Sequence, residues 1–239
     1  MGRLVGMMVM LVLAGGAIFG GYTVIQGVRT ETGAGEDHSY QGAPTHLVIG
    51  LDLSQSNVLV TNEQFARKVA DRIRPMIENL PPRSKVTLRT FGSYDSRSNP
   101  VHRDWTISAS NRPEEVAAFV HGVVGGVPQL VSDGRLRSQG YTNILAFLEN
   151  TSQLVDCFDN EVIVVLATDG VEDSEYVRLQ RASATLPTAD AMFDGCQRLE
   201  MLGVGQGLGS PSTTTRLRRE WDGWAEEAGF RRFVGLNDW

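Results

Sequence analysis

The segment from residue 45 to residue 53, THLVIGLDL, decides the fold class, because its apolar residues do not alternate with polar ones. A continuous apolar run of this length is typical of a strand buried on both faces, as the central strands of a parallel sheet are. The run ends at an acidic residue, Asp52. We therefore expect a central parallel strand with a carboxylate at its carboxyl end.

Helical and strand patterns alternate along the rest of the chain. Residues 61–80 have apolar side chains at helical spacing and are followed by two prolines, whereas residues 85–91 alternate at period two, typical of a strand nearer the rim. The other expected elements are a weak strand at 101–107, helices at 113–124, 142–157 and 215–228, a loop at 125–141, and strands at 161–167, 198–204 and 232–236. This alternation predicts a doubly wound α/β fold, with a mainly parallel sheet flanked by helices.

Composition limits the classes of protein and of partner. A chain of 239 residues with 41% hydrophobic residues supports one sizeable core and a short extra segment. The formal net charge is −6, and the arginines are not clustered into a stripe that would follow a phosphate backbone, so we do not expect a nucleic-acid partner. The two cysteines have no CxxC or Cys/His spacing that would indicate zinc.

Residues 4–28 contain no charged side chain, and as a helix they would be about 37 Å long, enough to cross a hydrocarbon core of about 30 Å. We favour a single transmembrane helix over a cleaved signal peptide, because apolar residues continue through residues 18–25 after the small residues at 14–16. Gly16 and Gly20 form a GxxxG pair that would let two such helices associate into a homo-oligomer. The general abundance of glycine in membrane helices explains the pair equally well.

The expected organisation is therefore a membrane anchor at residues 1–28, a linker at 29–43 and a folded domain at 44–239. The linker is polar, rich in glycine and without periodicity, which is typical of a flexible tether. A long folded domain behind a short amino-terminal stub favours export. We expect a single-pass protein of the cell membrane with an extracytoplasmic domain, periplasmic or extracellular.

Three polar clusters follow predicted strands or begin a predicted helix: DLSQS at 52–56, the threonine of GYTN at 142, and TDG at 168–170. In doubly wound folds ligands bind where the parallel strands end, which we call the carboxyl edge. All the candidate ligands are oxygen donors, which suit Mg²⁺ or Mn²⁺ better than Zn²⁺. Residues two apart in extended backbone point to the same side, so Asp52, Ser54 and Ser56 can converge. Helix capping and turn formation explain each cluster alone but not all three together.

The order and spacing of these clusters resemble the metal-ion-dependent adhesion site (MIDAS) of von Willebrand factor type A (VWA) domains. The layout matches over about residues 45–235, and the specific signal rests on five positions. The resemblance implies that Ser54, Ser56 and Thr142 ligate the metal through hydroxyls, and that Asp52 and Asp169 bind it directly or through water. It also implies a non-enzymatic module for adhesion or complex assembly, in which a partner protein supplies an acidic residue to the metal. The weak third strand and residues 125–140 depart from the common pattern.

Other functions are alternatives to this interpretation. Asp52 resembles the nucleophile of haloacid-dehalogenase-type phosphatases, but the acid/base position two residues later is Ser54, so a metal-dependent phosphohydrolase would lack its general acid. A serine hydrolase is not indicated, because GxSxG is absent and the four histidines are scattered. The glycine-rich run at 203–209 does not fit GxGxxG and predicts a loop near the metal. A VWA-type domain that assembles partners through other surfaces is a further alternative.

Cys157 and Cys196 each lie a few residues before a predicted buried strand. In a VWA-like topology these strands are parallel neighbours about 4.8 Å apart, which would bring both cysteines to the edge opposite the metal. A disulfide requires Cα atoms within about 7 Å and an oxidising compartment, and an exported domain would provide the compartment. Two buried free thiols are the alternative.

Overall fold

The computed structural model describes residues 43–93, 96–175 and 177–239. The predicted anchor, and the predicted linker up to residue 42, lie outside these residues. Contacts between Cα atoms divide the chain into two units, Met1–Gln41 and Gly42–Trp239, and the description concerns the second. Within the described ranges, no helix combines the length and the apolar character needed to span a membrane.

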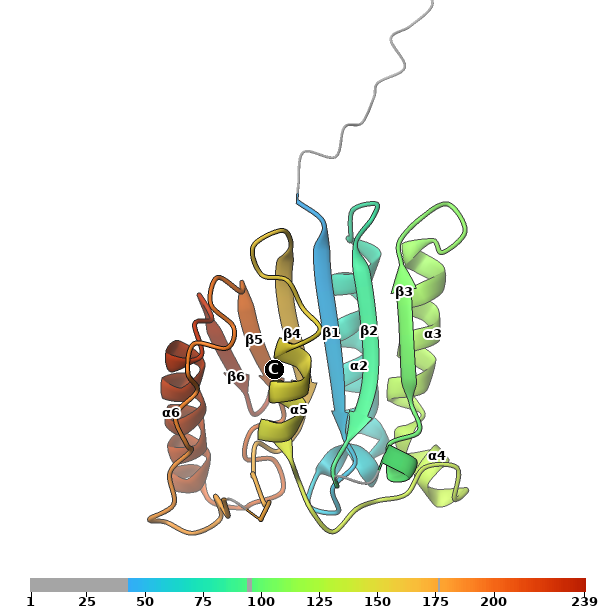
Figure 1. Cartoon of the computed structure of the whole chain (residues 1–239). Coiled ribbons are helices and arrows are strands. Elements are labelled where there is room, and N and C mark those ends of the chain that lie inside the picture. The colour runs from blue at the N-terminus through green and yellow to red at the C-terminus, as the bar shows by residue number, and fades with distance from the viewer. Residues whose placement is uncertain (1–42, 94–95, 176) are drawn as a thin grey trace, which may run out of the picture. The chain divides into compact units, whose positions relative to one another are not determined.

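Six strands form one sheet in the order β3-β2-β1-β4-β5-β6 (Figure 1). The strands are β1 (Thr45–Asp52), β2 (Lys85–Phe91), β3 (His102–Thr106), β4 (Glu161–Ala167), β5 (Arg198–Leu202) and β6 (Phe233–Leu236). Neighbouring strands are parallel except for β2 and β3, which are antiparallel. The expected α/β fold with a mainly parallel sheet is confirmed.

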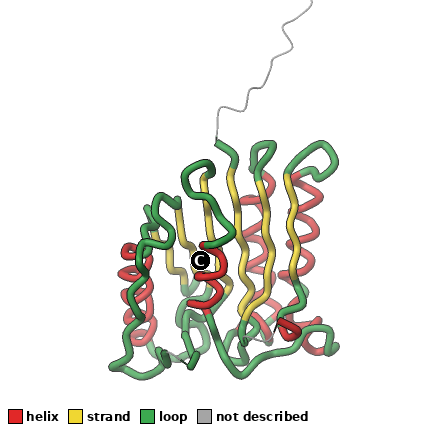
Figure 2. The backbone as a smooth tube through the Cα atoms, viewed as in Figure 1, coloured by secondary structure: helices red, strands yellow, loops and turns green. Residues whose placement is uncertain are grey.

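Helices cover both faces of the sheet (Figures 1 and 2). The helices are α2 (Glu63–Glu78), α3 (Pro113–Gly125), α4 (Val127–Ser132), α5 (Ile144–Ser152) and α6 (Pro211–Glu227), with short 3₁₀ turns η1 (Val58–Val60) and η2 (Ser96–Ser98). α2 and α3 pack on one face, and α5 and α6 pack on the other. Figure 2 shows that loops provide much of the cover beside α5 and α6.

The central strand β1 is buried at all its positions because successive residues enter different cores. Ile49 belongs to the apolar cluster that contains residues of α2 and α3, and Val48 belongs to the cluster that contains residues of α5 and α6. Burial of one such side chain contributes roughly 1.5–3 kcal/mol. The need for apolar residues on both faces explains the uninterrupted run that predicts this strand.

Several predicted boundaries were wrong. The loop expected at 125–141 contains the helix α4, which begins with two buried residues, Val127 and Pro128, the latter in the first turn, where proline is tolerated. The helix expected at 142–157 ends at Ser152, because the Asp156 carboxylate instead accepts the backbone N–H groups of two following residues in a local turn. The last helix begins at Pro211 and not at residue 215, because the side chain of Ser210 caps it by accepting from Thr213 N.

Cys157 and Cys196 form a disulfide, with their Cα atoms 4.7 Å apart. Both cysteines precede strands that pair in parallel, β4 and β5. The bond therefore lies at the edge opposite the carboxyl edge, as the topology predicts. The alternative of two free thiols does not hold in this structure.

Candidate metal centre

Asp52 is the last residue of β1 and its side chain is fully buried. Two donors fix its carboxylate: Ser54 N donates to Oδ1 at 2.8 Å, and the hydroxyl of Thr168 donates to Oδ2 at 2.7 Å. One donor follows β1 and the other follows β4. The carboxylate is therefore held between the ends of two neighbouring parallel strands.

The two predicted serine ligands lie close together. Ser54 Oγ and Ser56 Oγ are 3.3 Å apart, and Ser56 is exposed whereas Ser54 is buried. Asn57 stabilises this loop, because its side-chain amide donates to the carbonyl of Asp52 at 2.9 Å and to that of Ala167 at 3.0 Å. The two hydroxyls of DLSQS therefore lie side by side at the end of β1.

Asp169 follows β4 and is also fully buried. Its Oδ1 accepts from Val171 N at 2.9 Å, whereas its Oδ2 has no hydrogen-bond partner among the described residues. Gly170 has a φ of +75°, and its carbonyl accepts the indole N–H of Trp221 at 2.8 Å. A side chain at Gly170 would be strained by this φ and would also contact Trp221 Nε1 at 3.4 Å from its Cβ. The glycine of TDG thus permits the tight turn that follows Asp169 at the carboxyl edge.

Burial raises the pKa of both the Asp52 and the Asp169 carboxyl, because removal from water disfavours the charged form. The negative charge of Asp169 raises the pKa of Asp52 further, while hydrogen bonds from Ser54 and Thr168 lower it. The nearby Ser56 side chain acts in the opposite direction and lowers the pKa of Asp169. No lysine or arginine in the described ranges forms an ion pair with either carboxylate. The site thus has two adjacent acids without a protein counter-ion.

Thr142 reaches the same edge through backbone pairing. It is buried, and its backbone N–H and carbonyl bond to those of Asp173 at 3.2 and 3.0 Å. Three residues earlier, Gln139 N donates to Leu53 O at 2.8 Å and Gln139 O accepts from Gln55 N at 2.8 Å. In the described part of the chain, no hydrogen bond joins the Thr142 hydroxyl to the other four predicted ligands.

Two positioning residues were not identified from the sequence. Gln139 binds the DLSQS loop through its backbone, and its side-chain amide donates to Ser98 O at 2.9 Å. Glu172 is buried, and its Oε2 accepts from Ile144 N at 2.7 Å and Leu145 N at 3.2 Å, the first residues of α5. Burial raises the pKa of Glu172 to about 7. Their partners are distant in the chain, so no local sequence pattern indicates either role.

A metal at this edge would depend on hydroxyl ligands. Within the described residues, no group of three or more His, Cys, Asp or Glu side chains could hold a metal ion. The glycine-rich run at 203–209 lies at this edge as expected, since Gly205 N donates to Asp169 O at 2.8 Å. Among the described histidines, His46 bonds to Thr87, His102 lies on β3 and His121 pairs with Asp71.

Comparisons with known proteins identify no family for this chain. No protein-family model matches it, and no curated protein sequence matches it. Among solved structures, it is similar to BatB from Bacteroides thetaiotaomicron, a conserved hypothetical protein, with 16% identity over 82% of this chain and 91% of that one and a TM-score of 0.47. It is also similar to an aerotolerance-related membrane protein from Bacteroides fragilis, with 14% identity over 81% and 92% of the two chains and a TM-score of 0.42. The site is therefore interpreted from its own geometry.

Proposed function

We propose that residues 44–239 form a VWA-type domain that binds a divalent metal, Mg²⁺ or Mn²⁺, and uses it to bind an acidic residue of a partner protein. Residues 4–28 would hold this domain at a membrane. The observation that carries the proposal is the buried Asp169 Oδ2, which has no hydrogen-bond partner among the described residues, although the charge of Asp169 raises the pKa of the buried Asp52 carboxyl. An uncompensated pair of this kind is costly unless a cation neutralises it.

The donor set fits a hard cation. The residues that would hold the metal are Asp52, Ser54, Ser56, Thr142 and Asp169, which are carboxylates and hydroxyls. Oxygen ligands of this type suit Mg²⁺ and Mn²⁺. Two carboxylates and three neutral hydroxyls would leave a bound cation able to accept a further carboxylate in exchange for water. The exposed position of Ser56 leaves that side of the site open to a partner.

Binding is better supported than phosphate-ester hydrolysis. Ser54 N and the Thr168 hydroxyl hold the two oxygens of Asp52 in place, which suits a fixed ligand position. The position two residues after Asp52 is a serine, which cannot serve as the general acid of a phosphatase. His46 and His121 are engaged with Thr87 and Asp71.

Titration calorimetry and thermal melting of the full chain in detergent test the metal site. We expect one strong Mg²⁺ or Mn²⁺ site, and at a hundredfold excess over Kd the metal should stabilise the fold by about 2.7 kcal/mol. For a domain of this size that raises Tm by about 5–10 °C. Asp52→Asn and Asp169→Asn should abolish this rise. Asp159→Asn, which makes the same change at an exposed residue beside the disulfide, should retain it.

An equal metal-induced rise in wild type and Asp52→Asn would count against the assignment. The same protein should be offered a generic phosphate ester with Mg²⁺. Turnover that is lost in Asp52→Asn would support the phosphohydrolase in place of the binding module.

The membrane tether is tested separately. Intact-mass analysis of the protein from the membrane fraction should show that residues 4–28 are retained. A mature chain that begins near residue 17 would refute the anchor. Protease protection in spheroplasts would then determine on which side of the membrane the domain lies.

A further inference from the structure

Residues 135–142, which end at Thr142, are fixed along the carboxyl edge by three of their residues. Leu136 is buried in the core on the α2–α3 side. Gln139 bonds through its backbone to Leu53 and Gln55, on either side of Ser54, and Thr142 pairs with Asp173. The anchors are three residues apart, so the backbone between them has little freedom.

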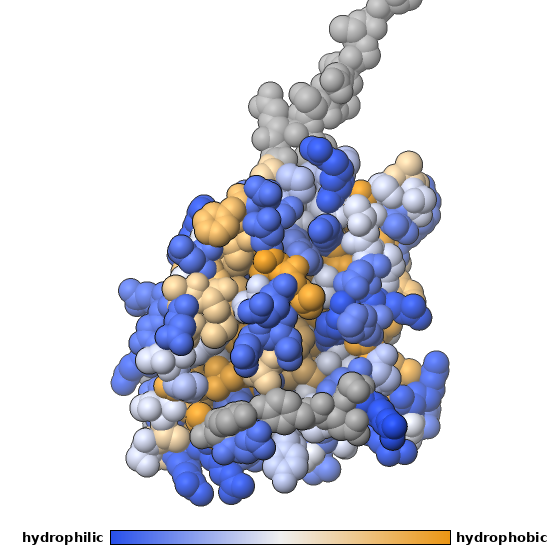
Figure 3. Space-filling model, in the orientation of Figure 1, coloured by the Kyte–Doolittle hydropathy of each residue, from blue (hydrophilic) through white to orange (hydrophobic). Residues whose placement is uncertain are grey.

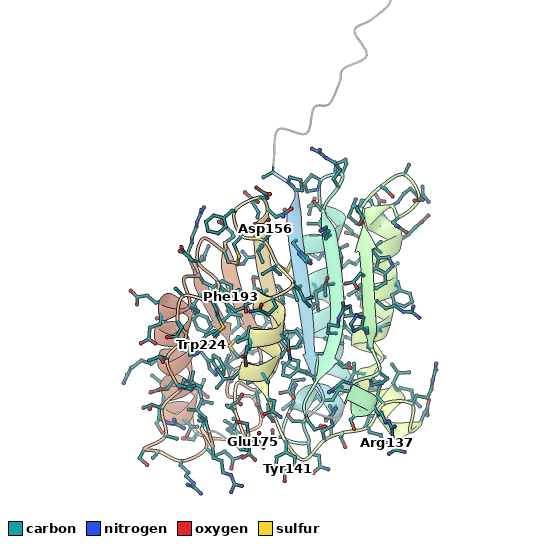
Figure 4. The ribbon with its side chains drawn as sticks, viewed as in Figure 1. Arg137, Tyr141, Asp156, Glu175, Phe193 and Trp224 are labelled. Carbon is teal, nitrogen blue, oxygen red and sulfur yellow. A yellow bond between two sulfur atoms is a disulfide. The ribbon has the colours of Figure 1, made fainter. Side chains whose placement is uncertain are left out.

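Three long side chains next to the anchors are exposed. Arg135 and Arg137 are exposed, and Tyr141 is 57% exposed, which is unusual for an aromatic side chain of a folded domain. Figure 4 shows Arg137 and Tyr141 at the end of the molecule where β1 and β2 terminate, with Asp156 at the opposite end. Neither arginine forms an ion pair within the described ranges. We call Arg135, Arg137 and Tyr141 the arginine–tyrosine strip.

We propose that the arginine–tyrosine strip is a docking surface for an extended acidic segment of the partner protein, which runs along residues 135–142 and places one carboxylate at the metal site beside Tyr141. The inference rests on the metal-dependent binding proposed above and specifies the partner's chemistry. The eight residues span at most about 26–29 Å when extended, so the partner segment would be about eight residues long.

Charge and side-chain chemistry favour this occupant. The chain as a whole carries a formal net charge of −6, whereas the strip presents two guanidinium groups that form no ion pair within the described ranges, so this surface is complementary to acids. Guanidinium groups bind carboxylates with two parallel hydrogen bonds, and exposed tyrosines are frequent anchors of protein interfaces. Two arginines near Asp133 are too few to follow a nucleic-acid backbone.

In the view of Figure 3, polar residues cover most of the face and hydrophobic residues form small separate areas between them. Phe158, a further exposed aromatic residue, is adjacent to the disulfide at the opposite edge. It provides a matched control for Tyr141.

Fluorescence anisotropy with the full chain in detergent tests the inference. The probe is a short fluorescein-labelled peptide in which glutamates alternate with leucine and serine, and its control has glutamine in place of every glutamate. The variants are Arg135→Glu with Arg137→Glu, and Tyr141→Ala. The matched controls are Arg231→Glu with Arg232→Glu, an exposed arginine pair directly before β6, and Phe158→Ala. Calorimetry with Mg²⁺ alone is repeated for every variant.

In Mg²⁺, the wild type and the matched controls should bind the acidic peptide and not the glutamine peptide. Reversal of both strip charges should weaken binding at least about tenfold, and Tyr141→Ala about fivefold, while the Mg²⁺ affinity stays unchanged. Two results would refute the strip inference and leave the metal site intact. In the first, the metal binds and the strip variants bind the peptide as well as the wild type does. In the second, the metal binds but the wild type does not bind the peptide. If strip-dependent binding survives chelation, the strip stands and the metal dependence is wrong. Absence of both metal and peptide binding would overturn both.

Discussion

The hydroxyl of Thr168 donates to Asp52 Oδ2 at 2.7 Å, although the two residues are 116 positions apart in the chain. The same hydroxyl oxygen accepts from Gly170 N at 3.1 Å, so one side chain ties the carboxylate after β1 to the turn after β4. Thr168 is fully buried. The orientation of Asp52 thus depends on a residue that would not itself bind the metal.

We predict that Thr168→Val destabilises the metal-free protein by about 1–3 kcal/mol, because it leaves a buried carboxylate oxygen and a backbone N–H without partners. The corresponding fall in Tm is about 2–12 °C. Thr168→Ser keeps the hydroxyl, so its loss of stability should be far smaller. Thermal melts in EDTA measure both, and calorimetry should show a weaker metal site in Thr168→Val only. Similar losses for the two variants would contradict the role of the hydroxyl.

Most of the sheet could be predicted from the sequence, because burial on both faces requires an uninterrupted apolar run. Residues 45–53 and 161–167 show this directly, and both are strands of the central pair. Helix ends were less predictable, because they depend on local competition. Ser210 caps α6 four positions earlier than the apolar pattern suggests, and the turn at Asp156 stops α5 before its predicted end.

The candidate site likewise has one part that could be predicted from the sequence and another that could not. DLSQS and TDG follow buried strands, so their meeting at one edge could be predicted from parallel topology. The roles of Gln139 and Glu172 could not, because their partners are 27 or more positions away and become neighbours only in the folded chain. Tertiary contacts of this kind have no sequence period.

Glu172 gives a prediction about pH. Burial raises its pKa from 4.5 to about 7, so the folded state favours the neutral acid. The associated stability is present below the ordinary pKa and is lost as the pH rises through about 7. In EDTA, the Tm of the wild type should therefore fall relative to that of Glu172→Gln between about pH 5 and pH 8.

The difference between the two proteins isolates Glu172, because other buried groups titrate in both. Burial raises the pKa of Asp52, as it raises that of Glu172. Burial lowers the pKa of His46 to about 4, so this residue destabilises the fold as the pH falls. A difference in Tm that does not change across this range would show that Glu172 does not titrate as described. Glu172→Gln should also retain most of the α5 contacts, since its amide oxygen can still accept from Ile144 N.

Glu200 gives a prediction about a buried charge. It lies on β5 with a fully buried side chain, and Arg72 Nε donates to its Oε1 at 3.0 Å. Arg198 lies 3.3 Å from Oε2. We predict that Arg72→Met destabilises the protein by about 3 kcal/mol, because it leaves a buried carboxylate with one poorly aligned partner.

The double variant Arg72→Met with Glu200→Leu should be more stable than Arg72→Met alone, since the apolar pair removes the buried charge. Urea unfolding at neutral pH measures both, with Arg74→Met as the control, because Arg74 pairs with Glu78 on the surface of the same helix. A double variant less stable than the single one would contradict this account. It would show that the carboxylate is stabilised by Arg198.

The disulfide gives the last prediction, because it separates stability from metal binding. Cys157 and Cys196 are 39 positions apart, and closing a loop of that length stabilises a fold by about 4 kcal/mol in the chain-entropy model. Protein purified from its native compartment should contain no free thiol after denaturation without reductant. Reduction, or Cys157→Ala with Cys196→Ala, should lower Tm by about 8–16 °C.

Metal affinity should be nearly unchanged by that loss. The bond joins the chain just before β4 and β5, whereas Asp169 follows β4, and the seven residues of that strand place the two ends about 20 Å apart. The strands between the two edges stay paired without the disulfide, so the geometry of the metal site should not change. Calorimetry of the oxidised and reduced proteins with Mg²⁺ at a temperature well below both melting points tests this. A large fall in affinity on reduction would show that the opposite edge controls the carboxyl edge, and two free thiols per chain in native protein would refute the bond itself.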